Sequence, residues 1–145
     1  MRAQCQCGQL AAQLPGPTFA VVACHCLACQ RRSGSPFAVL AYYPVDQVEI
    51  VGEARRFTRP TDEGNRFETF FCGDCGSTVY AKAGKHPSMI GIPVGAIANP
   101  SLQPPVRSVW EQKQTSLGYA ARSRAALRAG SRLALRATAA RPPHP

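Results

Sequence analysis

Through its first 110 residues the chain alternates between short apolar stretches and turn signals. Residues 37–43 are apolar enough for a buried strand, which Pro44 would end. In residues 45–51, apolar and polar positions alternate, as expected of a strand with one buried face. The same reasoning predicts further strands at residues 8–14, 18–23, 53–58, 65–71, 77–83 and 89–97. Many short strands separated by turn residues are typical of packed antiparallel sheets, so the pattern predicts an all-β domain, with one helical turn at residues 26–32.

The pattern changes near the end of the chain, where from Thr115 onward Ala, Arg, Leu and Ser dominate. We therefore expect a domain over residues 1–112 and a basic tail over residues 113–145, either helical or disordered. Arginines recur in this tail at a spacing that would place a drifting basic stripe on a helix: Arg124, Arg128, Arg132 and Arg136. Gly130 would cost such a helix about 1 kcal/mol relative to alanine, which favours a loosely ordered polycation. The composition is also typical of a GC-rich gene translated in a shifted reading frame.

Most of the positive charge lies in this tail. The 145 residues carry a formal net charge of +9. Residues 1–110 hold ten basic and seven acidic side chains, whereas residues 111–145 hold seven basic side chains and one acidic one. The tail could supply salt-sensitive contacts to nucleic-acid phosphates, but the body shows no basic stripe interleaved with aromatic residues. Nucleic-acid binding through the tail is therefore an alternative function, for which residues 1–110 give no additional support.

All seven cysteines lie in three short motifs: Cys5-Gln6-Cys7-Gly8, Cys24-His25-Cys26-Leu27-Ala28-Cys29 and Cys72-Gly73-Asp74-Cys75-Gly76. Thiolates gathered on short turns suit a thiophilic metal, and tetrahedral Zn²⁺ is the usual one. The odd cysteine count and the C-x-C spacings argue against a disulfide framework. The sequence also shows no apolar leader and no long apolar run. We therefore expect a cytoplasmic protein without a membrane span.

The seven thiols divide naturally into a set of four and a set of three. The first set joins two pairs, one near the N-terminus and one much later: Cys5, Cys7, Cys72 and Cys75. A four-thiolate site is coordinatively closed, so it is structural and couples metal binding to folding. The second set would hold another zinc ion with one position open for water or a substrate thiol: Cys24, Cys26 and Cys29. We therefore expect two zinc ions per chain.

Other polar residues beside the motifs have less specific signals. Arg31 and Arg32 are candidates for binding a substrate carboxylate, with solvated or backbone-bonded arginines as the alternative. His25 lies between two proposed ligands, but the middle side chain of a C-x-C motif usually points away from the metal. The remaining residues favour structural roles, in a surface loop, in a turn, or at a turn or helix cap: His86, Asp74, and Ser33 with Ser35.

In their order and spacing, the motifs resemble those of the glutathione-dependent formaldehyde-activating enzyme and centromere protein V family. The resemblance covers roughly residues 4 to 110 and extends through Arg31-Arg32-Ser33-Gly34-Ser35-Pro36-Phe37. It implies a β-tent fold of packed antiparallel sheets, with Cys5, Cys7, Cys72 and Cys75 on a structural zinc and Cys24, Cys26 and Cys29 on a catalytic zinc. Members commonly continue past a Trp-Glu region with a closing aromatic segment, whereas here Val109-Trp110-Glu111 leads into the basic tail.

The reaction that the resemblance implies is formation and cleavage of a carbon–sulfur bond, joining glutathione and formaldehyde to S-hydroxymethylglutathione. An open three-thiolate zinc suits this chemistry, because a thiol bound in the fourth position is deprotonated and can attack the formaldehyde carbon. We therefore predict a zinc-dependent carbon–sulfur lyase acting on glutathione or another small thiol. Two further alternatives are a non-catalytic thiol-binding or carrier module, and a protein in which all seven cysteines are structural. No motif specifies glutathione recognition or an oligomeric state.

Overall fold

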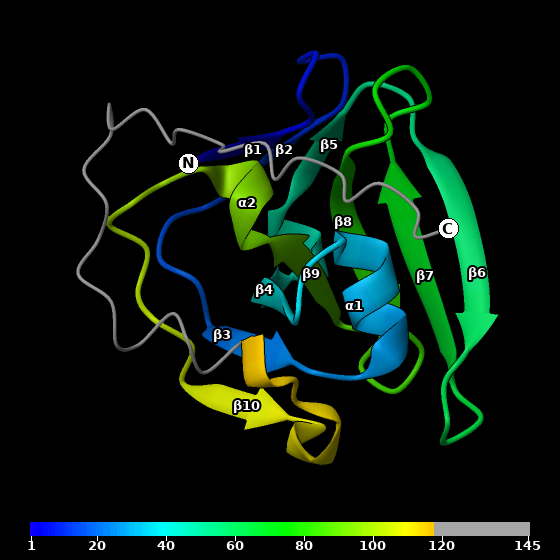
Figure 1. Ribbon diagram of the computed structural model, residues 1–145. Coiled ribbons are helices and arrows are strands. Elements are labelled where there is room, and N and C mark those ends of the chain that lie inside the picture. Colours follow the sequence, from blue (N-terminus) through cyan, green and yellow to red (C-terminus); the bar gives the residue numbers. More distant parts are fainter. Residues whose placement is uncertain (118–145) are drawn as a thin grey trace, which may run out of the picture.

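The computed structural model describes residues 1–117, and this part of the chain is mostly β-structure (Figure 1). The strands are β1 (Arg2–Gln4), β2 (Ala11–Gln13), β3 (Ala20–Cys24), β4 (Ala38–Pro44), β5 (Glu49–Val51), β6 (Arg55–Pro60), β7 (Arg66–Phe71), β8 (Thr78–Ala83), β9 (Met89–Pro93) and β10 (Arg107–Val109). The helices are α1 (Leu27–Ser33), α2 (Val94–Ile97) and the 3-10 turns η1 (Val45–Gln47) and η2 (Glu111–Lys113). The all-β prediction is confirmed.

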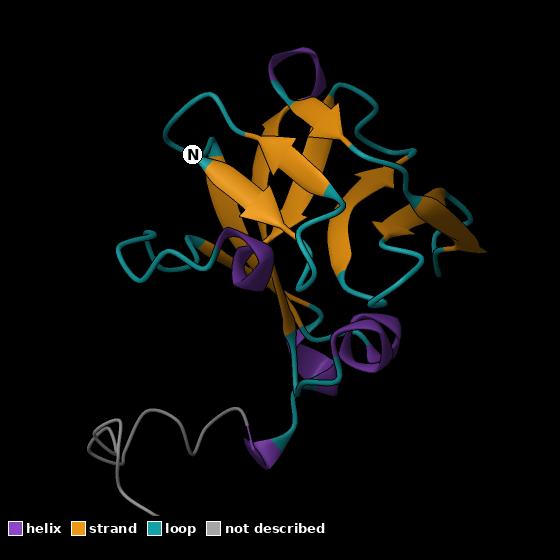
Figure 2. Ribbon diagram, turned by 90° about the horizontal axis from the view of Figure 1, so that it is seen from above, coloured by secondary structure: helices purple, strands orange, loops and turns teal. Residues whose placement is uncertain are grey.

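The strands form two sheets that enclose the core. A three-stranded sheet has the order β1-β2-β5, and a seven-stranded sheet has the order β10-β3-β4-β9-β8-β7-β6. Figure 2 shows the helices lying outside the strand layers. Residues of both sheets meet in one apolar cluster, in which the fully buried side chains include Leu10, Val21, Tyr43, Val79, Ile90 and Ile92. Burial of these side chains supplies the main driving force for folding.

The two faces of the large sheet have different surroundings, because successive residues of a strand point to opposite faces. In β3, Val21 and Ala23 point into the core and are buried. The alternate residues Val22 and Cys24 therefore face the other side, where they line a cavity beneath α1. The neighbouring strand β4 repeats this division, with Tyr43 in the core. One face of the sheet thus stabilises the fold while the opposite face carries cysteine chemistry.

The structure differs from the sequence prediction in four elements. Residues 89–97 begin as β9 but continue as α2, because a short apolar run does not distinguish strand from helix. Residues 45–51 begin with η1, so only β5 at their end is extended. The strands β1 and β10 were not predicted, since each has only three residues. In addition, β10 pairs with β3 in parallel, which departs from the expected antiparallel sheets.

Most of the predicted tail, residues 113–145, lies outside the described residues, which end at Leu117. Its predicted state, helical or disordered, therefore stays a prediction, as does the domain boundary at residue 112. Within residues 1–117, no helix has both the length and the apolar character needed to cross a membrane.

Gly52 provides a stability test of the contact between the β2 and β5 regions. Its φ of 92° lies in the left-handed region, and an added Cβ would overlap the carbonyl oxygen of Gln9. We expect Gly52→Ala to lower the free energy of unfolding by about 3 kcal/mol and the midpoint of thermal unfolding by at least about 10 °C. Gly95→Ala is the matched control, because a Cβ there meets no atom within 4 Å. A Gly52→Ala protein as heat-stable as the control would contradict this account.

Candidate functional site

The first cysteine cluster joins the small sheet to the large one. Cys5 and Cys7 follow β1, and their partners lie in the turn between β7 and β8, so the cluster comprises Cys5, Cys7, Cys72 and Cys75. The Sγ atoms of Cys5 and Cys7 are 3.4 Å apart, and those of Cys7 and Cys72 are 3.5 Å apart. All four sulfurs lie within 4.8 Å of one another. The cluster therefore brings together residues separated by 65 positions in the sequence.

Backbone hydrogen bonds fix both turns of this cluster. The N–H of Leu10 donates to the Sγ of Cys5 at 3.2 Å, and the N–H of Cys72 donates to the carbonyl of Ser77 at 3.0 Å. Burial raises the pKa of the Cys5 thiol, but the Leu10 N–H and the neighbouring thiols outweigh it, and the pKa is lowered overall. The Ser77 hydroxyl, 3.4 Å from Cys75, is the main reason that the Cys75 pKa is lowered to about 5. These turns thus favour the thiolate form at Cys5 and Cys75. At Cys7 the Gln9 N–H lowers the pKa, but the neighbouring cysteine side chains outweigh it and raise the pKa to about 12.

The second cluster comprises Cys24, Cys26 and Cys29, whose sulfurs also lie within 4.8 Å of one another. Cys24 ends β3, and Cys26 is the N-cap of α1, where its Sγ accepts a hydrogen bond from the N–H of Cys29 at 3.4 Å. Cys29 lies one turn into the helix and is buried. The end of a strand and the start of a helix therefore converge three thiols on one point.

Both donor sets fit zinc. Four sulfurs at about 2.3 Å from a tetrahedral ion lie about 3.8 Å apart, which matches the spacing in the four-cysteine cluster. Thiolates are the soft ligands that select zinc over magnesium or calcium. Among the described residues, no fourth Cys, His, Asp or Glu joins the second cluster. A zinc ion held there would keep one coordination position that no residue of 1–117 fills.

A cavity of about 460 Å³ lies directly over the three-cysteine cluster. Val109 comes from β10, the first strand of the large sheet, whereas Arg59 comes from β6, the last one. Both line this one cavity, so the sheet curves until its two ends approach each other across α1. In Figure 1, α1 accordingly lies between β10 and the pair formed by β6 and β7. The cavity therefore has the three thiols on one wall and a strongly basic hairpin on another.

The three thiols do not share the same pKa. The pKa of Cys29 is lowered to about 5, first because its thiolate accepts a hydrogen bond from Cys24, and then because of Cys26 and the guanidinium groups of Arg32 and Arg59. Burial opposes this shift. The pKa of Cys24 is raised, mainly because its thiol donates to Cys29. At neutral pH the cluster therefore already holds a thiolate at Cys29.

The two arginines after the cysteine motif lie in different surroundings. Arg31 is exposed and lines the cavity over the three-cysteine cluster. Arg32 lines a second, larger cavity of about 730 Å³, which reaches from the end of α1 to the four-cysteine cluster. Its Nε is buried without a hydrogen-bond partner among the described residues. Of the pair, only Arg31 lines the cavity over the open cluster, although the charge of Arg32 still reaches Cys29 and lowers its pKa.

The other polar residues considered from the sequence have structural surroundings. His25 is buried, lies outside both sulfur clusters and packs against Phe37, with ring centroids 5.4 Å apart. Asp74 is exposed in its turn. The Ser33 hydroxyl donates to the carbonyl of Cys29 at 2.9 Å, within α1, while Ser35 lines the larger cavity. His86 lies beside a separate apolar hollow next to β9.

Sequence reasoning missed four cavity residues that the fold brings to the cluster: Tyr42, Arg59, Trp110 and Lys113. The pKa of Tyr42 is raised by burial and then by the negative charge of the cysteine cluster, above all of Cys29, so its phenol stays protonated. The backbone of Trp110 is left-handed, with φ of 60°, an uncommon conformation for so large a residue. An outlier of this kind often marks a functional position, and the Val-Trp-Glu sequence was the only signal for it.

Gln30 attaches the last part of the cavity wall to the cysteine motif. Its Nε2 donates to the carbonyl of His25 at 2.7 Å and to the carbonyl of Lys113 at 3.0 Å. The N–H of His25 also donates to the carbonyl of Val109 at 3.0 Å. These bonds and the parallel pairing of β10 with β3 explain how a segment 80 residues away from Cys29 lines the same cavity, since Val109 pairs directly with Cys24.

Comparison with known families places this site in context. The family described as glutathione-dependent formaldehyde-activating enzyme matches residues 1–113. The chain belongs to this family. The match to the formaldehyde-activating family includes both cysteine clusters and every residue that lines the cavity over Cys24, Cys26 and Cys29. Family membership supports an activity that involves glutathione and formaldehyde.

The fold is similar to that of a Rhodobacter sphaeroides protein known from a crystal structure, with a TM-score of 0.56 and 19% sequence identity. The similarity covers 75% of this chain and 100% of the other. At this identity it shows a shared fold. No curated protein matches the sequence.

Proposed function

We propose that the protein is a zinc-dependent carbon–sulfur lyase that forms and cleaves the adduct of formaldehyde with glutathione, or with another small thiol. The observation that carries the proposal is the second cluster: three converging thiols with no fourth protein ligand among the described residues, at the wall of a 460 Å³ cavity. A metal site with three protein ligands and an open position is typical of catalysis, whereas a four-thiolate site is typical of structure.

Zinc bound to Cys24, Cys26 and Cys29 would supply acidification of the substrate thiol and would hold the resulting thiolate for attack on the aldehyde carbon. The residues that line the cavity would exclude water and donate hydrogen bonds to the substrate. Val22, Leu40 and Phe67 line it with apolar surface, which limits the water around the reacting atoms. The protonated phenol of Tyr42 offers a donor to the oxygen that becomes negative during attack.

Turnover is measured by exchange spectroscopy, which follows the interconversion of free formaldehyde and S-hydroxymethylglutathione in the NMR spectrum. We expect the zinc-loaded protein at micromolar concentration to accelerate this exchange well above the uncatalysed rate, by about 100-fold or more, which is a modest factor for an enzyme. The Cys26→Ser protein serves as the control without an intact open site. Binding of glutathione with no acceleration would instead favour a carrier module.

A further inference from the structure

We propose that Arg59 is a specificity-determining residue, which binds a carboxylate of the thiol substrate and so restricts the cavity to anionic thiols. This inference rests on the proposed function, because it concerns the ligand of the same cavity. Arg59 lies far from the cysteine motifs in the sequence, in β6, the edge strand of the large sheet.

Arg59 is held over the cavity by the strand that pairs with its own. In the register of β6 and β7, Arg59 lies directly opposite Phe67, and both residues line the cavity. The guanidinium carbon of Arg59 lies 5.0 Å from the centre of the Phe67 ring, and one Nη donates to the carbonyl of Pro60 at 3.0 Å. These contacts limit the freedom of the side chain and leave other N–H donors for a ligand, which lowers the entropic cost of binding.

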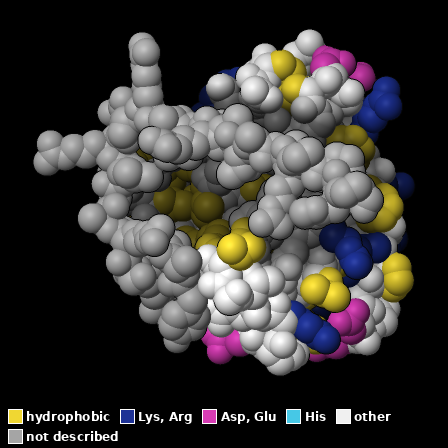
Figure 3. All heavy atoms as spheres, in the orientation of Figure 1, with side chains coloured by type: hydrophobic (Ala, Val, Ile, Leu, Met, Phe, Trp, Pro, Cys, Tyr) yellow, Lys and Arg dark blue, Asp and Glu magenta, His cyan; other side chains and the backbone are white. Residues whose placement is uncertain are grey.

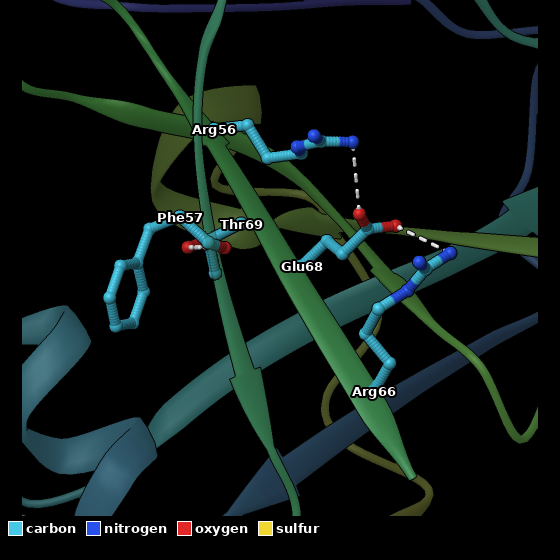
Figure 4. Close-up of polar contacts among 5 residues, drawn as sticks. All are labelled: Arg56, Phe57, Arg66, Glu68 and Thr69. Carbon is cyan, nitrogen blue, oxygen red and sulfur yellow. Dashed lines mark hydrogen bonds and ion pairs between the residues drawn. The ribbon is translucent and has the colours of Figure 1, made fainter.

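The carboxylate of Glu68, on the strand paired with β6, already forms ion pairs on the opposite face. Glu68 forms ion pairs with Arg56 at 3.3 Å and with Arg66 at 3.8 Å, and Figure 4 shows it held between them. Since neighbouring residues of a strand point to opposite faces, Glu68 and Arg56 lie on the face away from Arg59. Within residues 1–117, Arg59 forms no ion pair. The sequence has no acidic residue after Glu111 that could provide one.

The charges around the cavity favour an anion. Three cations line it, Arg31, Arg59 and Lys113, against a single carboxylate, Asp62. Figure 3 shows Lys and Arg side chains over the part of the molecule where β6 and β7 run. Glutathione carries two carboxylates and one ammonium group, which corresponds to this pattern of several cations and one acid. A planar guanidinium binds a carboxylate through two parallel hydrogen bonds, so Arg59 can select the ligand by geometry as well as by charge.

The protein contains its own reporter of this binding. Trp110 is the single tryptophan of the chain, and it lines the same cavity. Its fluorescence should therefore respond to a thiol that enters, and the dissociation constant is obtained by titration whether or not the protein turns substrate over.

The experiment titrates the zinc-loaded full-length protein with glutathione and with 2-mercaptoethanol, a thiol that carries no carboxylate. For Arg59→Gln we expect the dissociation constant for glutathione to rise by about 10- to 100-fold, the loss typical of a hydrogen-bonded charged group. The constant for 2-mercaptoethanol should not change. The dissociation constant of Arg59→Lys for glutathione should lie between those of Arg59→Gln and the unaltered protein, because lysine keeps the positive charge but cannot form two parallel hydrogen bonds to a carboxylate. Arg56→Gln, on the opposite face, is the matched control and should bind glutathione as the unaltered protein does.

A steady-state measurement separates recognition from general damage. If Arg59 acts in recognition, Arg59→Gln raises KM for glutathione and leaves kcat unchanged at saturating thiol, with zinc content and thermal stability unaltered. Equal glutathione affinity in Arg59→Gln and the unaltered protein would overturn the assignment of Arg59 while leaving the proposed function intact. A fluorescence signal that no thiol changes in the unaltered protein would overturn the proposed function and this inference together.

Discussion

Replacing Cys26 with serine should lower the bound zinc from about two ions per chain to about one and abolish formaldehyde turnover, while the protein remains folded. The reason is that the second cluster has only three thiols, so the loss of one leaves two ligands. Zinc per chain is measured on the purified protein by elemental analysis, and folding is measured by circular dichroism. The cluster is local to β3 and α1, so its metal should not be needed for the rest of the sheet to form.

The choice of serine separates metal binding from helix capping. The Sγ of Cys26 caps α1 by accepting the N–H of Cys29, and serine is a favourable N-cap, whereas alanine is not. Cys26→Ala should therefore lose the same zinc and also about 1 kcal/mol of stability, a fall of about 4–8 °C in the unfolding midpoint. About one zinc in both the unaltered protein and Cys26→Ser would mean that only the four-cysteine cluster binds metal, and the enzymatic proposal would lose its chemical basis.

Replacing Cys72 with serine should have the larger structural effect, because the variant should fail to reach the native fold. Cys72 is buried and belongs to the cluster that joins β1 to the turn between β7 and β8. A structural zinc site contributes about 10–16 kcal/mol in small zinc proteins, as much as the whole stability of a typical domain. We expect the near-ultraviolet circular dichroism and the dispersion of amide NMR signals to be lost.

Asp74→Asn is the control for this substitution, since Asp74 lies in the same turn but is exposed. It should keep about two zinc ions and a native spectrum. A well-dispersed NMR spectrum of Cys72→Ser with zinc still bound at the second cluster would show that the four-cysteine site is dispensable for folding.

The sequence was most informative where the chemistry is local. Cys24, Cys26 and Cys29 lie within six residues, so any fold of that segment brings them close. The division into four and three thiols agrees with the two groups that the structure brings together, while their roles as structural and catalytic ligands stay predictions. The strand pattern was equally clear where an apolar run is bounded by turn residues, as in β3 and β4.

What could not be predicted depends on the curvature of the sheet. Arg59 and Lys113 are ordinary surface cations by sequence, and only the approach of the two ends of the large sheet places them at one cavity. Curvature arises from the sum of many strand twists and leaves no mark at a single residue. Similarly, the short strand β10 has no alternating pattern that would predict its parallel pairing with β3. Arg31 and Arg32 are adjacent in sequence, yet the turn of α1 sends them to different cavities.

The long sequence separation within the four-cysteine cluster has a consequence for how the protein would acquire metal during its synthesis. Five of the seven thiols, at positions 5, 7, 24, 26 and 29, are translated before Cys72. The 43 positions from Cys29 to Cys72 take roughly 2–9 s to translate at about 5–20 residues per second. During that interval any four of the five early thiols can satisfy a zinc ion, so the nascent chain can trap metal in a set that no native site uses. On the proposed zinc assignment, the native distribution of metal requires Cys72 to be translated before the early thiols capture zinc, and we expect slower synthesis or excess zinc to favour the wrong ligands.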